Sequence, residues 1–457
     1  FACDGYYYNG KTFDSSQRLS EICRQIPSIQ QRVIVPIIEP DKDIPDSQKY
    51  EDFLLTENTP PLEFEQLPFD HPLYIVYSSG TTGVPKCIVH GAGGTLLQQL
   101  KEHRLHVDLR SDDVLFYFTT CGWMMWNWLV AGLGSEATLI LYDGAPFFPS
   151  SRAMIDIIDA EQISVFGTSA KYIDGLQKSG ATPRKSHKLD HLRLILSTGS
   201  PLSHESFRYV YRHIKADVCL SSISGGTDII SCFVLGNPAM PVWEGQIQCR
   251  GLGMAVEIWN ASGQSVLEEK GELVCVRPFP STPIGFWNDS EGKKYHDAYF
   301  ATYPNVWAHG DYAEITAQGG VIIHGRSDAV LNPGGVRIGT AEIYRQVAKL
   351  DSVLESLCIG QDWEGDVRIV LFVVLRDAVE LNDELVSSIR DVIRRGTTPR
   401  HVPAKVIAVA DIPRTLSGKI SELAVRDTVH GRAVTNHDAL ANPEALAQFR
   451  ELPALKF

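Results

Sequence analysis

A short stretch rich in glycine and hydroxyl side chains, residues 77–86, restricts the fold of this chain more than any other feature. It follows an apolar run at residues 73–77 that is typical of a buried strand. Glycines let the backbone approach an anion, hydroxyls add donors, and Lys86 adds a positive charge. The stretch predicts a phosphate-binding loop made of Ser78, Ser79, Gly80, Thr81, Thr82, Gly83 and Lys86. A plain surface loop is the alternative, and the spacing GxxxxGK[ST] of the P-loop does not match.

Composition excludes several classes of protein. The 457 residues suffice for two or three domains, and 44% hydrophobic with 21% charged residues is typical of a globular protein. The net charge of −13 argues against a nucleic-acid partner, and no apolar run approaches the roughly 18 residues of a membrane span. Nine scattered cysteines without a CxxC pair favour reduced thiols in a cytoplasmic protein. The start at Phe1 reads like the middle of a fold, so we expect an N-terminally incomplete chain.

Strand-like and helix-like segments alternate through the first two thirds of the chain. Strands are expected at 113–118, 137–142, 163–167 and 192–198, and helices at 94–100 and 151–160. This alternation predicts an α/β fold with mostly parallel sheets, whose ligands bind at the carboxyl ends of the strands.

The pattern changes toward the C-terminus. Short strands at 254–259, 271–276, 312–316 and 320–324 predict a small antiparallel β-barrel within residues 250–325. Strands at 366–375 and 405–410 with a helix at 382–394 then predict a small α/β domain. We expect a large domain at 1–327 and a small domain at 328–457, with the boundary at Asp328.

Small residues follow two of the expected strands, at 197–202 and 221–228. Each segment alone is more typical of an ordinary strand-to-helix turn than of a site, and the Gly310–Asp311 turn alone is a weak signal. Their occurrence together after a phosphate loop favours a nucleotide site.

The motifs together resemble those of the adenylate-forming acyl-CoA synthetase superfamily, over essentially the whole chain. They are the phosphate loop, the two small-residue turns, the segments 307–311 and 325–332, and the run 412–420. The phosphate loop departs from the superfamily's pattern at Cys87, and the segment 325–332 departs from it at Ala329 and Asn332. In this superfamily a large domain is hinged to a small one that rotates between two half-reactions.

The resemblance implies that ATP lies across these turns, with the phosphate loop on its β- and γ-phosphates. The other nucleotide-binding residues would be Gly199, Ser200, Pro201, Ser222, Ile223, Ser224, Gly225, Gly226, Asp311, Arg326 and Arg337. Thr227 would bond the α-phosphate, and Asp228, where glutamate is usual, would hold Mg²⁺. Asp311 would accept the ribose hydroxyls. Surface ion pairs are the alternative for the two arginines.

The resemblance also implies a catalytic lysine, a hinge and a tunnel. Lys419 would stabilise charge while the acid attacks the α-phosphorus. The small domain would then rotate about Asp328, so that Gly334 and Gly335 line a tunnel for the thiol arm of coenzyme A. No protein nucleophile is required.

Within the superfamily the chain is most similar to the acetoacetyl-CoA synthetases, on the segments 64–69, 86–90, 122–128 and 222–231. Gly225 stands where acetyl-CoA synthetases carry a tryptophan, which leaves room for a longer acid. The opposite wall of the acyl pocket would be Trp123, Met124, Met125 and Trp126, whereas Trp128 is more typical of a core residue. The implied substrates are acetoacetate, ATP and coenzyme A. Alternatives are another short- or medium-chain acid, a catalytically inactive nucleotide-binding fragment, or loading of a carrier protein.

Overall fold

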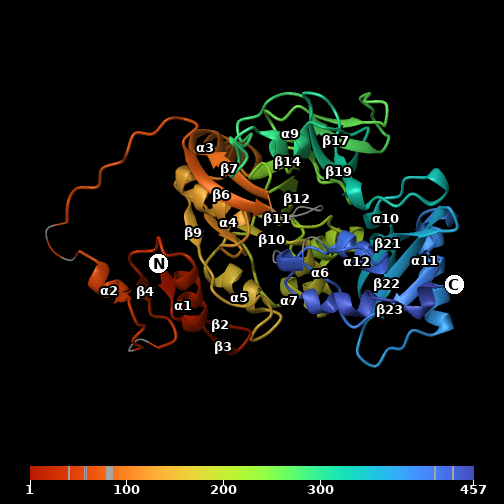
Figure 1. The fold of residues 1–457 in the computed structure, drawn as a ribbon, viewed down its shortest axis with the longest axis horizontal. Coiled ribbons are helices and arrows are strands. Elements are labelled where there is room, and N and C mark those ends of the chain that lie inside the picture. The colour runs from red at the N-terminus through yellow and green to blue at the C-terminus, as the bar shows by residue number, and fades with distance from the viewer. Residues whose placement is uncertain are drawn as a thin grey trace. The chain divides into compact units, whose positions relative to one another are not determined.

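The structure, a computed structural model, describes residues 1–39, 42–55, 57, 59–78, 86–415, 418–434 and 437–456 (Figure 1). The chain divides into two compact units. Unit 1 is Phe1–Leu67 with Leu141–Ala160, and unit 2 is Pro68–Ile140 with Glu161–Phe457. The boundary expected at Asp328 falls inside unit 2 and stays a prediction.

Unit 1 contains a small parallel sheet, β1-β4-β5, made of β1 (Ala2–Cys3), β4 (Val33–Val35) and β5 (Gln48–Lys49). It also contains a hairpin of β2 (Gly5–Tyr8) and β3 (Lys11–Asp14), with helices α1 (Ser16–Gln25), α2 (Tyr50–Phe53) and α5 (Ala153–Ala160). The expected helix at 151–160 is therefore confirmed. Asp4, which is buried, accepts backbone N–H bonds from residues 37–39 and so holds the end of β4 to the start of the unit.

The centre of unit 2 is a five-stranded sheet in the order β12-β11-β10-β8-β9, and all of its recorded pairings are parallel. Its strands are β8 (Val114–Tyr117), β9 (Thr138–Ile140), β10 (Val165–Ser169), β11 (Leu194–Thr198) and β12 (Cys219–Ser222). Four consecutive residues of β10 and of β11 are buried, which is typical of strands covered on both faces. The predicted parallel α/β architecture is confirmed.

Helices connect these strands. They are α3 (Ala92–Lys101), which continues into the π-helix η1 (Glu102–His106), α4 (Met125–Ala131) with η2 (Gly132–Ser135), α6 (Ala170–Lys178), α7 (Pro183–Ser186) and α8 (His204–Tyr209) with η3 (Val210–Ile214). Two of them begin at serines whose hydroxyls accept a backbone N–H of the first turn, Ser169 for α6 and Ser203 for α8. Leu115, Leu196 and Leu129 pack together between the sheet and α4.

The strand before the phosphate loop is present but is not buried as predicted. It is β6 (Pro72–Ser78), at the edge of a sheet with β7 (Lys86–Gly91) and β18 (Gly285–Phe286). Alternate side chains of β6 are exposed, with Leu73 at 46%, Ile75 at 42% and Tyr77 at 69%. An edge strand pairs on one side only, so an apolar sequence run does not by itself bury it.

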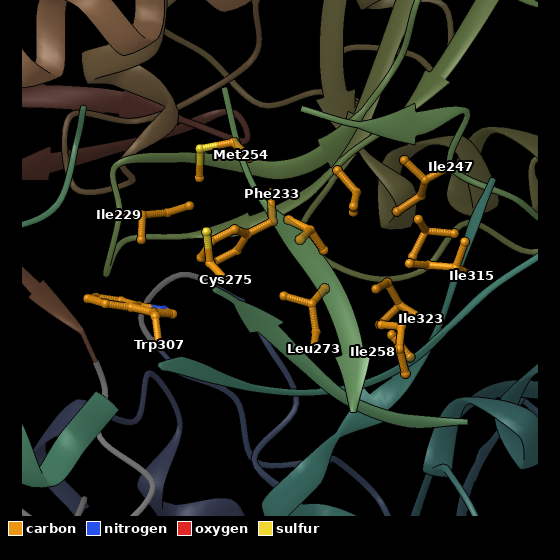
Figure 2. Close-up of a cluster of buried hydrophobic side chains, with 14 of the residues drawn as sticks. Ile229, Phe233, Ile247, Met254, Ile258, Leu273, Cys275, Trp307, Ile315 and Ile323 are labelled. Atoms are coloured by element: carbon orange, nitrogen blue, oxygen red, sulfur yellow. The ribbon is translucent and has the colours of Figure 1, made fainter. Parts of the chain in front are cut away.

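Two antiparallel sheets follow. The order of the first is β13-β14-β15 and that of the second is β16-β17-β19-β20. Their strands are β13 (Ser224–Gly226), β14 (Ser231–Leu235), β15 (Cys249–Arg250), β16 (Val256–Trp259), β17 (Gly271–Cys275), β19 (Trp307–Ile315) and β20 (Val321–Arg326), with helix α9 (Lys293–Tyr299) between β18 and β19. Figure 2 shows their shared core, in which Phe233, Leu273 and Trp307 lie together. The antiparallel pattern expected for this region is confirmed, and β16 and β20 form the two edges of the second sheet in its described part.

The C-terminal part is built on a sheet in the order β21-β22-β23, of β21 (Val353–Trp363), β22 (Asp366–Leu375) and β23 (Lys405–Ala408). Its helices are α10 (Thr340–Val347), α11 (Asp383–Gly396) and α12 (Glu422–Val429), and its short turns are η4 (Ser327–Ala329), η5 (Pro333–Gly335), η6 (Pro399–His401), η7 (His437–Ala439), η8 (Pro443–Phe449) and η9 (Pro453–Leu455). Alternate residues of β22 pack on opposite faces: Leu371 against α11 and Phe372 against α12 and Phe449. Within the described residues, none of the helices combines the length and the apolar character needed to cross a bilayer.

Candidate nucleotide and acid site

The site is centred on Asp228, which lies in the turn between β13 and β14. Its carboxylate forms an ion pair with Lys86 and accepts a hydrogen bond from the Tyr299 hydroxyl at 2.6 Å. Burial by itself would raise the pKa of the Asp228 carboxyl, but the Lys86 charge and these hydrogen bonds lower that pKa well below its usual range. Asp228 is therefore ionised at neutral pH, as a cation-binding carboxylate must be.

Tyr299 is held in place by its ring. It is the last residue of α9, is 3% exposed, and stacks on Trp307 with ring centroids 3.7 Å apart and an interplanar angle of 14°. Burial and the adjacent Asp228 carboxylate raise the pKa of the Tyr299 hydroxyl, so it remains protonated and donates. The Lys86 ammonium lies 4.9 Å from the centroid of the same ring.

His90 connects β7 to the Thr227–Asp228 turn. Its ring Nε2 lies 3.0 Å from the Thr227 carbonyl oxygen, which accepts the bond. Burial lowers the pKa of His90 to about 4, so the ring is neutral at pH 7 and Nε2 carries the donated proton. Because Lys86 and His90 are four residues apart on one strand, they face the same side and contact consecutive residues of the turn.

The two small-residue turns lie at the carboxyl ends of neighbouring strands, β11 and β12. The Ile223 N–H donates to the Ser197 carbonyl at 2.9 Å, and the Thr198 hydroxyl donates to the Ile223 carbonyl at 3.0 Å. Gly199 has φ = +90°, which favours glycine there. The structure therefore brings the predicted segments at Gly199, Ser200 and Pro201 and at Ser222, Ile223 and Ser224 to one edge of the sheet.

Gly225 and Gly226 each lie so close to neighbouring atoms that a side chain at either position would be crowded. A Cβ at Gly225 would lie 2.1 Å from the Ser231 carbonyl oxygen, and one at Gly226 would lie 3.0 Å from the His309 ring. Gly225 therefore has a packing reason to be glycine, besides the wider acyl pocket that the sequence suggested. A tryptophan introduced at this position would disturb the β13–β14 pair before it reached any ligand, so that substitution does not test the pocket.

The predicted acyl wall divides into a surface part and a core part. Trp123 lies beside the turn at residues 199–201, because its ring is 3.9 Å from the position that a Cβ on Gly199 would take. Met125 is 3% exposed and belongs to the core with Trp128, whose predicted core role is confirmed. Trp123 and the similarly half-buried Met124 and Trp126 are the members of the segment with surface to offer a ligand.

Two of the predicted nucleotide-binding residues, Asp311 and Arg326, lie next to each other. They are paired across β19 and β20, and the Arg326 guanidinium lies 3.1 Å from the Asp311 carboxylate. The guanidinium also donates to the His309 carbonyl at 3.2 Å. Burial would lower the pKa of Arg326, but the neighbouring carboxylates raise it overall, which keeps this cation charged. Arg337 lies over the ring of Tyr312, the residue after Asp311, at 5.3 Å from its centroid.

Lys419 faces this cluster from the C-terminal part of the chain. It follows Gly418, which has φ = +80°, in a turn closed by a bond from the Thr415 N–H to the Lys419 carbonyl at 2.8 Å. The Lys419 side chain keeps solvent access, yet surrounding protein lowers the pKa of its ammonium, as does the Arg326 charge, while Asp311 and Asp228 act in the opposite direction. Lys419 is thus within electrostatic reach of three predicted site residues.

The hinge and tunnel residues are placed nearby in the chain. Asp328 lies in η4, 3.9 Å from the Arg326 guanidinium, and its carbonyl accepts a bond from Arg426 at 3.3 Å. Gly334 and Gly335 both have positive φ, and the Gly334 N–H donates to Asp366 at 3.0 Å. Their predicted roles in rotation and in coenzyme A binding stay predictions.

Most of the predicted phosphate loop, Ser79, Gly80, Thr81, Thr82 and Gly83, lies outside the described residues. The described ends are Ser78 and Lys86, which pair with each other as the last and first residues of β6 and β7. The strand before the loop and the strand after it therefore form one hairpin that carries the loop.

Comparison with known proteins assigns the family. The model of the family described as AMP-binding enzyme matches residues 7–281. The chain belongs to the AMP-binding enzymes.

Relatives of this AMP-binding enzyme extend over nearly the whole chain. An acetoacetyl-coenzyme A synthetase of Rhizobium meliloti (strain 1021) is 61% identical, over 99% of this chain and 70% of that protein. An acetoacetyl-CoA synthetase of Xenopus tropicalis is 48% identical, over 98% of this chain and 68% of that protein.

Solved structures give the same picture. The acetoacetyl-CoA synthetase from Streptomyces lividans superimposes with a TM-score of 0.93 and 41% identity, over 99% of this chain and 70% of that one. An anthranilate CoA ligase in complex with anthranoyl-AMP superimposes with a TM-score of 0.75 at 20% identity, over 90% of this chain and 76% of that one, and shows likeness of fold. The α/β class predicted from the sequence is confirmed for this AMP-binding enzyme.

Several residues that touch the site were given no role from the sequence. Tyr299 belongs to none of the motifs, and His90 and His309 lie inside the segments 86–90 and 307–311 without an assigned role. Each meets a predicted site residue far along the chain. Glu272 is similar: it accepts the Gly310 N–H at 2.8 Å and a bond from the Ser327 hydroxyl, and so ties β19 to η4. The aromatic residues between 295 and 307 are the sequence signal from which such a ring cluster could have been inferred.

The donor set around Asp228 fits a magnesium ion that is shared with a nucleotide. Among the described residues there is no group of three or more His, Cys, Asp or Glu side chains able to hold a metal alone. Mg²⁺ commonly uses one or two carboxylates together with substrate phosphates and water. One ionised carboxylate at the base of the phosphate hairpin suits that mode of binding.

Proposed function

We propose that this chain is an acid–thiol ligase that activates acetoacetate with ATP and transfers the acyl group to coenzyme A. The products are acetoacetyl-CoA, AMP and pyrophosphate. The observation that carries the proposal is the convergence of predicted site residues, in the Lys86–Asp228 pair, the Asp311–Arg326 pair and Lys419. The 61% identity to an acetoacetyl-coenzyme A synthetase over 99% of the chain supports the choice of acid.

In the first half-reaction, a carboxylate oxygen of the acid attacks the α-phosphorus of ATP. The bond to the β-phosphate oxygen breaks, and pyrophosphate leaves with the electron pair. Negative charge on the oxygens of the transferring group must be stabilised, and positioned cations do this well in a site shielded from water. Lys419 supplies that charge, and Thr227 orients the α-phosphate.

Asp228 would hold the magnesium ion that accompanies ATP. Magnesium, when bound, neutralises phosphate charge and screens the attacking anion from the triphosphate. In the structure the Lys86 ammonium is paired with the Asp228 carboxylate. When ATP binds, this ammonium turns to the phosphates, so its anionic partner changes from the carboxylate to the nucleotide. Asp311 receives the ribose hydroxyls, with Arg326 holding its carboxylate in place.

In the second half-reaction, the thiol sulfur of coenzyme A attacks the acyl carbon. The bond to the AMP oxygen breaks, AMP leaves, and the thiol proton passes to solvent. Rotation about Asp328 withdraws Lys419 and brings Gly334 and Gly335 to the pantetheine arm. None of the nine cysteines forms a disulfide or is assigned a covalent role, and a reducing cytoplasmic location suits them.

The test is exchange of labelled pyrophosphate into ATP with Mg²⁺ present, run across acetoacetate, acetate, butyrate and longer acids. We expect acetoacetate to give the highest kcat/KM, and addition of coenzyme A to convert that acid to its thioester. Preference for a different acid would replace acetoacetate in the proposal. Absence of exchange with every acid, although the protein binds Mg·ATP, would overturn the ligase activity itself.

A further inference from the structure

The helix that follows the phosphate hairpin buries a polar face where an apolar one is usual. Along α3 and the π-helix η1, the side chains of Gln98, Gln99, Glu102, His103 and His106 are each at most 2% exposed. Buried polar groups are retained where they find hydrogen-bond partners, and π-helical turns are frequent at functional sites. The partners of this face identify what it holds.

Glu102 is the hub of these contacts. Its Oε1 accepts bonds from the Gln98 amide at 3.2 Å, from the Cys232 N–H at 3.1 Å and from the Ser231 hydroxyl. Its Oε2 accepts the Trp128 indole N–H at 2.9 Å. One fully buried carboxylate therefore binds β14 through one oxygen and α4 through the other.

Residues near Glu102 on the same helix form further polar contacts along β14. Gln99 donates to the Ile230 carbonyl at 3.1 Å, just before that strand, and His106 lies 2.8 Å from the Gly236 carbonyl, just after it. The helix thus contacts the first residues of one strand and the residues that flank both of its ends through polar bonds, which restrict the position of the strand along its axis.

Each element that Glu102 joins is connected to a predicted wall of the acid pocket: β14 pairs with the strand that holds Gly225, and α4 holds part of the opposite wall. In β14, Cys232 pairs with Gly225 of β13, and Gly225 has no room even for a Cβ. In α4, Trp128 lies within two turns of Trp123 and Trp126. A shift of either element would change the distance between the walls.

We propose that Glu102 is a positioning residue that sets the separation of these walls and thereby the choice of carboxylic acid. The inference rests on the proposed function, since it assigns a determinant of specificity to that reaction. Glu102 acts through Trp128 and Ser231–Cys232 and need not touch the acid.

Glu102→Gln tests the proposal through the orientation of its amide. Three hydrogen-bond donors face Oε1, and the Lys101 ammonium lies 3.6 Å from it, so the amide oxygen is favoured there and the NH₂ group then points at the Trp128 N–H. The amide NH₂ and the Trp128 N–H are then two donors that repel each other, so α4 loses its hydrogen bond to residue 102. Trp128→Phe removes the same anchor and keeps an aromatic ring in the core, so it tests the inference even if Glu102→Gln folds poorly.

The expected result is a loss of discrimination with little change toward the nucleotide. The ratio of kcat/KM for acetoacetate to that for acetate or butyrate should fall roughly tenfold in both variants, since a hydrogen bond to a buried charge is worth about that factor or more. The KM for ATP should stay within about twofold of wild type. The double variant should be no worse than Glu102→Gln, because Trp128→Phe removes the repelled donor.

Asp113→Asn is the matched control. Asp113 is also a buried carboxylate, bound by Arg193 at 2.6 Å and by the Ser164 hydroxyl at 2.6 Å. It stands before β8, at the end of the sheet opposite the carboxyl edge. Its replacement should lower stability and leave the acid ratio unchanged.

The outcomes separate the two proposals. If the wild-type protein gives no exchange with acetoacetate, the proposed function fails. If wild type discriminates among the acids and both Glu102→Gln and Trp128→Phe keep its ratios, or if Asp113→Asn shifts them equally, the positioning role of Glu102 is overturned.

Discussion

The hydroxyl of Tyr299 offers a test of how the Asp228 carboxylate is held. Tyr299→Phe removes one hydrogen bond of 2.6 Å and keeps the ring that stacks on Trp307. Hydrogen bonds to charged groups contribute about 1.5–3 kcal/mol. Because Asp228 is 17% exposed and retains Lys86, we take the lower end, about 1.5 kcal/mol, which is roughly a tenfold change in an equilibrium constant.

The expected result is about a tenfold weaker affinity for Mg·ATP in equilibrium titration, with a decrease of about 1.5 kcal/mol in the free energy of unfolding in urea. Tyr295→Phe is the matched control: Tyr295 lies in the same ring cluster, 5.4 Å from Tyr299, while the donors recorded to Asp228 among the described residues are Lys86 and Tyr299. This control should keep wild-type affinity.

The pH dependence of stability provides a second test of the contact between Tyr299 and Asp228. The pKa of Asp228 is lowered in the folded state, so the stability from its partners is complete above its unfolded pKa of about 3.9 and is lost as pH falls toward the folded value. The stability difference between wild type and Tyr299→Phe should therefore narrow in strong acid. Equal Mg·ATP affinity in wild type and Tyr299→Phe would refute the view that this hydroxyl positions Asp228.

Three further predictions concern other parts of the site. Lys419→Ala should lower pyrophosphate exchange by more than about 100-fold while sparing thioester formation from added acyl-adenylate, and Asp328→Pro should do the reverse; equal loss of both steps in either variant would refute its assigned role. Burial lowers the pKa of His90 from 6.5 to about 4, so the unfolded state binds the extra proton between these values, and stability should fall as pH drops through that window, by up to about 3 kcal/mol for this residue. His90→Gln should remove this contribution to the pH dependence of the free energy of unfolding, measured in urea, and an unchanged pH dependence would contradict a buried neutral ring. Gly225→Ala should destabilise the chain by roughly 3 kcal/mol or more, with activity lost for all acids alike, because its Cβ would meet the Ser231 carbonyl; a stable variant with altered acid preference would restore the simple pocket interpretation.

The elements that could be predicted from sequence are those specified by neighbouring residues. Alternating apolar runs and turn residues identified the strands of the parallel sheet and most of the antiparallel strands, since side-chain periodicity is a local property. The strand β6 shows the limit of this reasoning. Its apolar run was assigned to the interior, whereas its place at a sheet edge leaves Tyr77 at 69% exposure, and no local pattern states which strands acquire two neighbours.

The same division holds for the site. Asp228, Asp311, Arg326 and Lys419 were identified from motifs because each occupies a short segment of recognisable residue types, and the structure places them in one electrostatic cluster. The contacts that hold them join segments far apart in the chain. Lys86 meets Asp228 across 142 positions of sequence, and a network such as that of Glu102 with Ser231 spans 129.

By itself, the sequence determined the kinds of group that the site uses and the order of strands and turns that present them, because turn chemistry and side-chain periodicity act over a few residues. Only the tertiary structure decided which charge neutralises which, why Gly225 cannot carry a side chain, and that a buried carboxylate at Glu102 joins β14 to α4. Those outcomes depend on packing between segments more than a hundred residues apart, where a shift of one strand or one helical turn would pair different atoms.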